Sequence, residues 1–207
     1  MYIPPNMGIA ERSECEAFIA SNSFAVLTSS DLQVTHLPLV LSEDCTRLRG
    51  HFARANRHWR QLEEQRVVAV FSGPHAYISP SWYADSPAVP TWNYAAVHVY
   101  GTVKLTSDEM LAETLDQMLQ HFEPALLETR DIVTPDYQAK LQRAIIGFEI
   151  DIESIEGKQK LGQLRSGGDQ RGVSKALASS DRLDDRMLNE YMKQTGLGLG
   201  NNEEKLK

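Results

Sequence analysis

Residues 73–101, GPHAYISPSWYADSPAVPTWNYAAVHVYG, are the part of this 207-residue chain that the needs of an ordinary core do not explain. The stretch combines Trp and Tyr side chains with four prolines and two histidines. Its aromatic residues are Tyr77, Trp82, Tyr83, Trp92, Tyr94 and Tyr100. Buried Trp and Tyr need hydrogen-bond partners, so this density is costly as mere filler. A planar ligand or a subunit interface would explain it.

Extended segments enter and leave this stretch. The apolar run at 67–73, VVAVFSG, predicts a central strand that continues as an extended piece over 75–80. Residues 81–90 are expected to form a loop, and VHVYGTVKL at 97–105 alternates as a strand, with Gly101 at a bulge or a close approach. We therefore expect two barrel strands joined by a loop that helps to wall a ligand site and meets another subunit.

Further strands are predicted on both sides of this stretch. FAVLTS at 24–29 is a short strand, and residues 32–41 and 46–52 alternate around a turn, which predicts a hairpin. Pro38 lies inside the first arm of that hairpin and indicates an edge strand or a bulge. IGFEIDI at 146–152 alternates as a final half-buried strand.

Helical periodicity or helix-start signals mark five segments. They are the run from Ser13 through Ile19, residues 53–64, a helix to Phe122 after a capping box at 106–109, residues 134–143, and residues 180–195. Residues 154–172 are polar and glycine-rich, which suggests a functional loop, and residues 196–207 are expected to be a frayed tail. Six or seven hairpin-linked strands with peripheral helices predict a mainly antiparallel β fold of the α+β class, closed into a small β-barrel.

The composition is that of an ordinary globular chain, with 42% hydrophobic and 24% charged residues. No apolar run is long enough to span a bilayer. The amino end has neither the basic start nor the apolar core of a secretory signal, so we expect a cytoplasmic protein without a membrane partner. Cys15 and Cys45 are too few for a disulfide framework and are expected to be free thiols.

Charge argues against general nucleic-acid binding, because the net charge of −7 repels DNA over the whole surface. Two basic islands, 47–66 and 158–175, are candidates for holding a phosphate. Free N–H groups at the amino end of helix 53–64, beside Arg54 and Asn56, would form such a pocket; a solvated arginine face is the alternative. A phosphate pocket beside an aromatic platform fits a flat anionic ligand such as flavin mononucleotide, FMN.

The sequence contains no familiar metal or nucleophile motif. The histidines are scattered without HxH or HExxH spacing, and no GxSxG, GxxxxGK[ST] or GxGxxG pattern opens a catalytic or nucleotide-binding unit. His36 and His51 would face each other across the predicted hairpin, either as ligands or as histidines hydrogen-bonded within the fold. No catalytic residue and no metal ligand is assigned.

Several blocks of the chain resemble one known family. They are the starting MYIPP, THLPL (35–39), GHFARANRHW (50–59), GPHAYISPSWY (73–83), VPTWNYAAVHVYG (89–101) and GFEIDIESIEGKQKL (147–161). Together they resemble the PaiB-type proteins, described as FMN-binding negative transcriptional regulators. The resemblance implies the FMN-binding split barrel, and a homodimer with two flavin sites at the subunit interface.

The resemblance also implies a set of cofactor-binding residues. Matching the family's blocks position by position gives Thr35, His36 and Leu37 under the flavin, His51, Ala53, Arg54 and Asn56 near the ring edge and phosphate, Thr91 and Asn93 from the TWNY block, and Lys158, Lys160 and Gln163 from the connector. The family's connector usually reads KxKLSQN, whereas Gly162 and Leu164 stand here, so two hydrogen-bonding groups are missing and FMN would bind weakly or be absent. Residues 1–165 would form the FMN-binding split-barrel domain, and 166–207 a C-terminal helical extension and tail.

Three functions remain open from the sequence. The first is a dimeric flavin-binding protein used for sensing or for a modest reductase activity. The second is a regulator that acts without bound flavin, either indirectly or by contacting DNA; indirect action is favoured because no basic recognition helix is found. The third is a haem-handling enzyme or a flavin-dependent oxidoreductase on the same barrel, using His36, His51 or His98.

Overall fold

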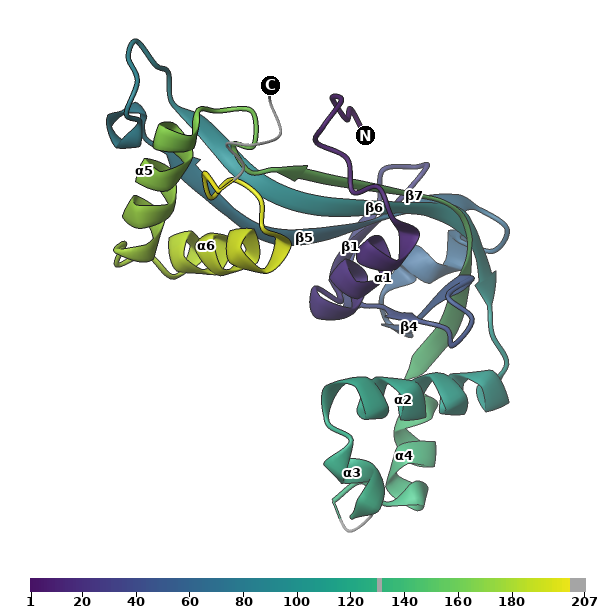
Figure 1. Cartoon of the computed structure of the whole chain (residues 1–207). Coiled ribbons are helices and arrows are strands. Elements are labelled where there is room, and N and C mark those ends of the chain that lie inside the picture. Colours follow the sequence, from purple (N-terminus) through teal and green to yellow (C-terminus); the bar gives the residue numbers. More distant parts are fainter. Residues whose placement is uncertain (130–131, 202–207) are drawn as a thin grey trace. The chain divides into compact units, whose positions relative to one another are not determined.

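The computed structural model describes residues 1–129 and 132–201. Its strands form one sheet in the order β2-β1-β5-β6-β7-β4-β3 (Figure 1). The strands are β1 (Phe24–Ser29), β2 (Val34–Pro38), β3 (Val40–Leu41), β4 (Arg47–Ala53), β5 (Arg66–Ile78), β6 (Thr91–Leu105) and β7 (Ile145–Lys160). The defined pairings of β1 with β2 and β5, and of β4 with β3 and β7, are all antiparallel. The predicted antiparallel β fold is confirmed.

The described residues also form helices. They are α1 (Arg12–Ser21), α2 (Asp108–Phe122), α3 (Ala125–Glu128), α4 (Pro135–Gln142), α5 (Gly167–Ala178) and α6 (Leu183–Thr195), with 3-10 turns η1 (Arg57–Gln61) and η2 (Pro80–Trp82). Within the described residues, none of these helices is both long and apolar enough to cross a membrane.

The chain divides into two compact units, each assembled from separated segments. Unit 1 contains residue 1 and residues 10–71 and 97–156, and unit 2 contains residues 2–9, 72–96 and 157 onward. The strands β5, β6 and β7 each contribute residues to both units.

The core of unit 1 follows from strand alternation. Leu48 and Phe52 of β4 and Phe148 and Ile150 of β7 are fully buried on one face of the sheet, and the rings of Phe52 and Phe148 lie 4.7 Å apart. Gly101 lies against the backbone of β7, where an added Cβ would overlap the carbonyl oxygen of Asp151. The predicted close approach at this glycine is therefore confirmed.

The core of unit 2 is a separate apolar cluster. Ala76 and Ile78 of β5 pack with Leu161 and with side chains of α5 and α6, namely Val173, Leu177, Leu188 and Met192. Trp82 and Tyr83, from the aromatic stretch of the sequence, pack against this cluster. Trp82 and Tyr83 therefore help to form the core of unit 2.

Residues 196–200, at the carboxyl end of unit 2, were predicted to be part of a frayed tail, and this prediction is wrong. Leu197 and Leu199 pack on the apolar cluster, and Gly198 and Gly200 are buried. The backbone N–H of Gly200 donates to Oε1 of Gln170 at 2.8 Å. Alternating glycines with positive φ let the chain turn back over α5 and α6, which a composition-based argument does not reveal. Residues 202–207 lie outside the described part.

The predicted hairpin over 32–52 is also corrected. β2 pairs with β1, with Phe24 opposite Pro38, and of the predicted first arm only the short β3 pairs with β4. The strand breaks at the fully buried Leu39, whose N–H bonds to the Ser23 carbonyl at 2.9 Å. His36 therefore lies opposite Val26, so the two histidines of the predicted hairpin do not face each other.

Two helix predictions and one loop prediction need correction. Residues 53–64 form no α-helix, because β4 continues through Ala53 and only the 3-10 turn η1 follows. Of the predicted loop at 154–172, only residues 161–166 are a loop. Residues 154–160 are the end of β7 and 167–172 are the start of α5, whose three glycines have low helix propensity. The cap of α2 is Ser107, which accepts from the Met110 N–H, in place of Thr106.

Candidate functional site

The twelve predicted cofactor-binding residues fall into one group in each unit. Unit 1 contains Thr35, His36, Leu37, His51, Ala53, Arg54 and Asn56, and unit 2 contains Thr91, Asn93, Lys158, Lys160 and Gln163.

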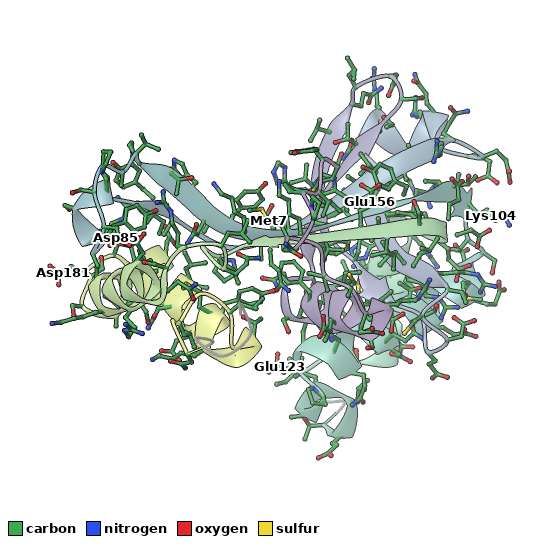
Figure 2. All side chains as sticks on the ribbon, turned by 45° about the horizontal axis from the view of Figure 1, so that its top comes forward. Met7, Asp85, Lys104, Glu123, Glu156 and Asp181 are labelled. Atoms are coloured by element: carbon green, nitrogen blue, oxygen red, sulfur yellow. The ribbon has the colours of Figure 1, made fainter. Side chains whose placement is uncertain are left out.

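A cavity of about 300 Å³ in unit 2 gathers three of them. It is lined by Met7 (Figure 2), Tyr83, Val89, Pro90, Thr91, Asn93, Lys160, Gly162, Leu164 and Arg165. The Lys160 ammonium donates to the Thr91 hydroxyl, and Asn93 is only 2% exposed. Two cations and no carboxylate are among these lining residues, so the wall favours an anion.

Both positions that depart from the family's connector line this cavity. Gly162 has φ +80°, and its Cβ position lies 3.5 Å from the Asn93 amide nitrogen. A side chain at this position would be strained, because L residues rarely adopt that conformation. Leu164 places a mostly exposed apolar side chain in the wall where the family has an amide.

Arg165 and Tyr83 also line the cavity, although neither is among the twelve predicted cofactor-binding residues. The Arg165 guanidinium lies 4.3 Å from the centre of the Tyr83 ring, and its Nη1 lies 3.7 Å from Oδ2 of Asp169. A stacked guanidinium keeps donors free along its edge. The basic island at 158–175 and the aromatic stretch each contained one partner, but spacing along the chain could not show that they meet.

Lys158 and Gln163 do not line the cavity. Lys158 is buried, with its ammonium 3.0 Å from the Tyr2 carbonyl and within 5.5 Å of the rings of Tyr2 and Tyr94. The Gln163 amide accepts from the Leu161 N–H and donates to two backbone carbonyls, so its polar atoms brace the loop. The polar groups of both residues are therefore bonded within the protein.

In unit 1, Thr35 and Asn56 are joined by a buried histidine that the sequence did not single out. His58 is 2% exposed; its Nε2 lies 2.8 Å from the Ser29 hydroxyl and its Nδ1 lies 2.8 Å from the Thr35 hydroxyl. Asn56 donates to Thr35 at 3.1 Å and accepts from the His58 backbone N–H.

These contacts fix the direction of each hydrogen bond. Ser29 donates its proton to Asp31, so Nε2 of His58 carries hydrogen and donates to Ser29. Nδ1 then accepts from Thr35, which in turn accepts from Asn56. Burial lowers the pKa of His58 and outweighs the opposing effect of the Asp31 carboxylate, which agrees with a neutral ring.

The remaining unit 1 residues have mixed environments. Leu37 belongs to the core, and His36 is exposed with its ring 6.3 Å from that of Phe24. Ala53 is exposed at the end of β4, and Arg54 donates to the carbonyls of residues 143 and 145. Burial lowers the pKa of His51, whose Nδ1 is buried without a hydrogen-bond partner.

The predicted phosphate pocket at the amino end of helix 53–64 is not formed, because the turn there is short and Asn56 occupies the N–H of His58. The structure shows Cys15 and Cys45 as free thiols, as expected. Across residues 1–129 and 132–201, no group of three or more His, Cys, Asp and Glu side chains is placed to hold a metal ion.

Comparison with known proteins identifies the family of this chain and related folds. The family model described as "Putative FMN-binding domain" matches residues 1–154. The chain is 36% identical over 203 residues to the protease synthase and sporulation protein PAI 2 of Bacillus subtilis (strain 168), covering 93% of this chain and 96% of that protein.

Solved structures agree in fold. The flavocytochrome Anf3 of Azotobacter vinelandii superposes with a TM-score of 0.60 at 18% identity, covering 74% of this chain and 69% of that one. The FAD and heme binding protein of Mycobacterium smegmatis gives 0.61 at 12% identity, covering 75% and 74%. At such identities the likeness concerns the fold, and it confirms the predicted split barrel.

The family model and the relative PAI 2 point in the same direction, since one describes an FMN-binding domain and the other matches nearly the whole chain. They support flavin as the cofactor. The chain belongs to the FMN-binding family of PaiB-type proteins.

Proposed function

We propose that this chain is an FMN-binding protein of regulatory function and that the unit 2 cavity holds the anionic part of the cofactor. The observation that carries the proposal is the meeting of Thr91, Asn93 and Lys160 around one cavity that also contains Arg165. The first three also belong to the cofactor set that the family resemblance implies.

The donor chemistry of the cavity fits FMN. Lys160 and Arg165 supply positive charge for a phosphate, while Thr91 and Asn93 add a hydroxyl and an amide. A volume of about 300 Å³ is at the lower end for ligand pockets, so it suits part of the cofactor rather than all of it. When bound, FMN supplies a flat ring that accepts and gives electrons. The chain's own residues hold and orient it.

Titration with FMN and riboflavin tests the proposal directly. Lys160→Ala is expected to weaken FMN binding roughly tenfold to a hundredfold, because a contact to a charged group is worth about 1.5–3 kcal/mol. Riboflavin lacks the phosphate, so its affinity should change little. Lys193→Ala, at an exposed lysine that pairs with Glu190, is the matched control. Failure of the wild-type chain to bind FMN, or equal losses for both ligands, would overturn the assignment.

We propose further that the functional form is a homodimer. Large apolar side chains remain exposed on the sheet in both units: Phe24 and Val34 in unit 1, and Tyr77 and Trp92 in unit 2. Exposed apolar patches of this kind mark interaction surfaces. Light scattering on the full chain should give twice the monomer mass of 23.2 kDa, and Trp92→Glu should lower it. A monomeric wild type at micromolar concentration contradicts the proposal.

Regulation by this protein is proposed to be indirect. The net charge of −7 opposes a phosphate backbone. A gel-shift titration with DNA from upstream of its own coding sequence should show no salt-dependent complex. A specific complex whose affinity falls steeply with salt would establish direct DNA binding instead.

A further inference from the structure

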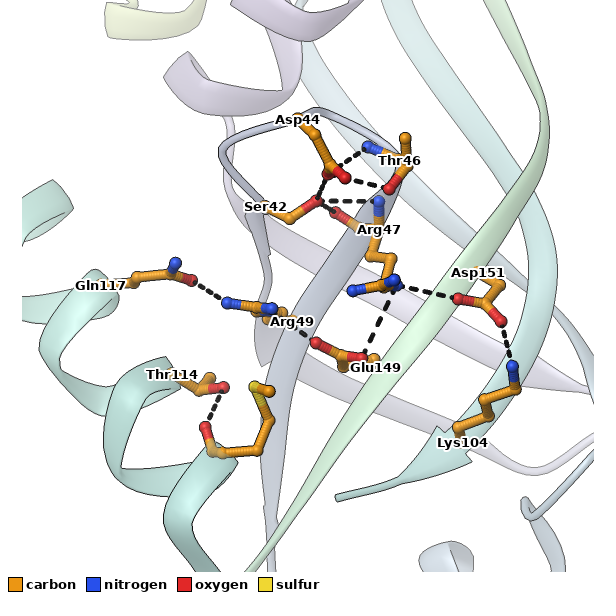
Figure 3. Close-up of polar contacts among 11 residues, drawn as sticks. Ser42, Asp44, Thr46, Arg47, Arg49, Lys104, Thr114, Gln117, Glu149 and Asp151 are labelled. Carbon is orange, nitrogen blue, oxygen red and sulfur yellow. Dashed lines mark hydrogen bonds and ion pairs between the residues drawn. The ribbon is translucent and has the colours of Figure 1, made fainter. Parts of the chain in front are cut away.

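A second cavity, of about 340 Å³, lies in unit 1 and contains none of the predicted cofactor residues. It is lined by Ser42, Glu43, Asp44, Arg47, Arg49, Glu113 and Gln117. Figure 3 shows the two arginines on β4 between Gln117 of α2 and the carboxylates of β7. The family assignment and the proposed flavin role leave this cavity unexplained.

Arg49 forms the buried part of its wall. The residue is 8% exposed; its Nε donates to Glu149 at 2.6 Å and its Nη1 donates to Gln117 at 3.1 Å. A guanidinium has five N–H donors, so three of those of Arg49 have no partner among the described residues. Nη2 carries two of these donors and is accessible to solvent at the cavity that Arg49 lines. A ligand or water in the cavity can therefore accept from them.

Arg47 lies two residues earlier and on the same face of β4. Its Nε donates to Asp151 at 3.2 Å and lies 3.8 Å from Oε2 of Glu149, while its terminal nitrogens have no partner in the part of the chain that the structure describes. Lys104 also pairs with Asp151, at 2.6 Å. Three cations thus meet two carboxylates, which leaves one surplus positive charge on this side of the cavity.

The rim of the cavity is acidic. Asp44 is already occupied: it accepts from the hydroxyls of Ser42 and Thr46 and from a backbone N–H, and these bonds lower its pKa to about 2. Glu43 and Glu113 are exposed, and neither makes a hydrogen bond or an ion pair within the described residues. They are therefore available to a cationic group.

We propose that this cavity binds a small zwitterion of the free α-amino acid class. Its carboxylate accepts from the unpaired N–H groups of Arg49 and Arg47, and its ammonium lies against Glu113 or Glu43. A simple anion would meet three acidic lining residues, and a simple cation would meet two guanidinium groups, so each half alone is disfavoured. A ligand with both charges satisfies both sides.

Thermal-shift and calorimetric titrations of the full chain test this. Glycine and L-alanine are the probes, and acetate and methylamine serve as half-ligands at matched ionic strength. We expect a saturable rise in melting temperature with the amino acids and none with the half-ligands. Absence of saturable stabilisation by either amino acid, or acetate as effective as glycine, would overturn the proposal.

Two variants locate the site. Glu113→Gln, on an exposed face of α2, should weaken amino acid binding roughly fivefold without unfolding the chain. Glu14→Gln is its control, because it removes an exposed carboxylate of unit 1 outside the cavity. Arg49→Lys should weaken binding about tenfold or more, with circular dichroism used to check folding. If Glu113→Gln and Glu14→Gln weaken amino acid binding equally, the effect comes from the net charge of the protein, and the proposed site is refuted.

Discussion

Replacing His58 by alanine should destabilise the chain by about 3 to 5 kcal/mol. The substitution removes two buried hydrogen bonds, each worth about 1 kcal/mol, and leaves the hydroxyls of Ser29 and Thr35 without that partner. It also empties the space of a ring that is 2% exposed and lies 5.6 Å from the Phe52 ring, which adds a cavity term. His58→Gln, which keeps polar atoms in the gap, should recover part of the loss.

The same histidine makes stability depend on pH. Its folded-state pKa lies below the ordinary value of about 6.5, so the unfolded chain binds more protons in the window between the two values. Stability therefore falls as the pH drops through that window. His51 and His98 have pKa values lowered mainly by burial and contribute in the same direction. The alanine variant should lose the share of the slope that belongs to His58.

Urea unfolding between pH 5.5 and 8, followed by tryptophan fluorescence, measures both effects. The midpoint should shift with little change in m-value if the variant acts on the folded state. A loss below about 1 kcal/mol at pH 8, or a pH slope identical to that of the wild type, would refute the assigned hydrogen-bond chain.

Three further outcomes are expected. Glu149→Ala leaves Arg49 buried without its carboxylate and should lower the free energy of unfolding by about 3–5 kcal/mol in a denaturant titration. The control Glu153→Ala, at an exposed ion pair, should lower it by less than about 1 kcal/mol, and similar losses for the two variants would contradict the burial argument. Gly101→Ala forces a Cβ against the backbone of β7 and should lower the free energy of unfolding by about 2 kcal/mol or more. The melting temperature should then fall by roughly 4–8 °C, and an unchanged melting temperature would show that β6 and β7 can move apart to admit the methyl group. Leu164→Asn restores the family's amide in the unit 2 cavity and should raise FMN affinity about tenfold by titration, and unchanged affinity would place that side chain away from the cofactor.

Local patterns predicted the strands better than their partners. Local sequence marked β1 as a short strand, and alternation marked residues 146–152 of β7, but such patterns carry no information on which strand lies next to which. Residues 34–38 therefore seemed to pair forward with β4, whereas Pro38 and the buried Leu39 end β2 and leave it on β1. Sequence spacing cannot resolve that choice.

For the candidate site, too, the sequence predicted individual residues better than their contacts. The family's blocks pointed to Thr91, Asn93 and Lys160, which the structure brings to one cavity. Sequence reasoning could not distinguish a polar side chain that faces a cavity from one that braces backbone, as Gln163 does. His58 escaped notice because both its nitrogens bond to short side chains from β1 and β2, far away along the chain.

The segmented make-up of unit 2 has a consequence for the order in which the protein is synthesised. Ala76 and Ile78 leave the ribosome about 95 residues before Val173 of α5, and the helices that cover them come last. Until α5 and α6 have been made, this apolar part of β5 has none of its helical cover, and such exposure favours aggregation. A nascent chain that stalls near residue 165 should consequently recruit chaperones more strongly than the completed protein.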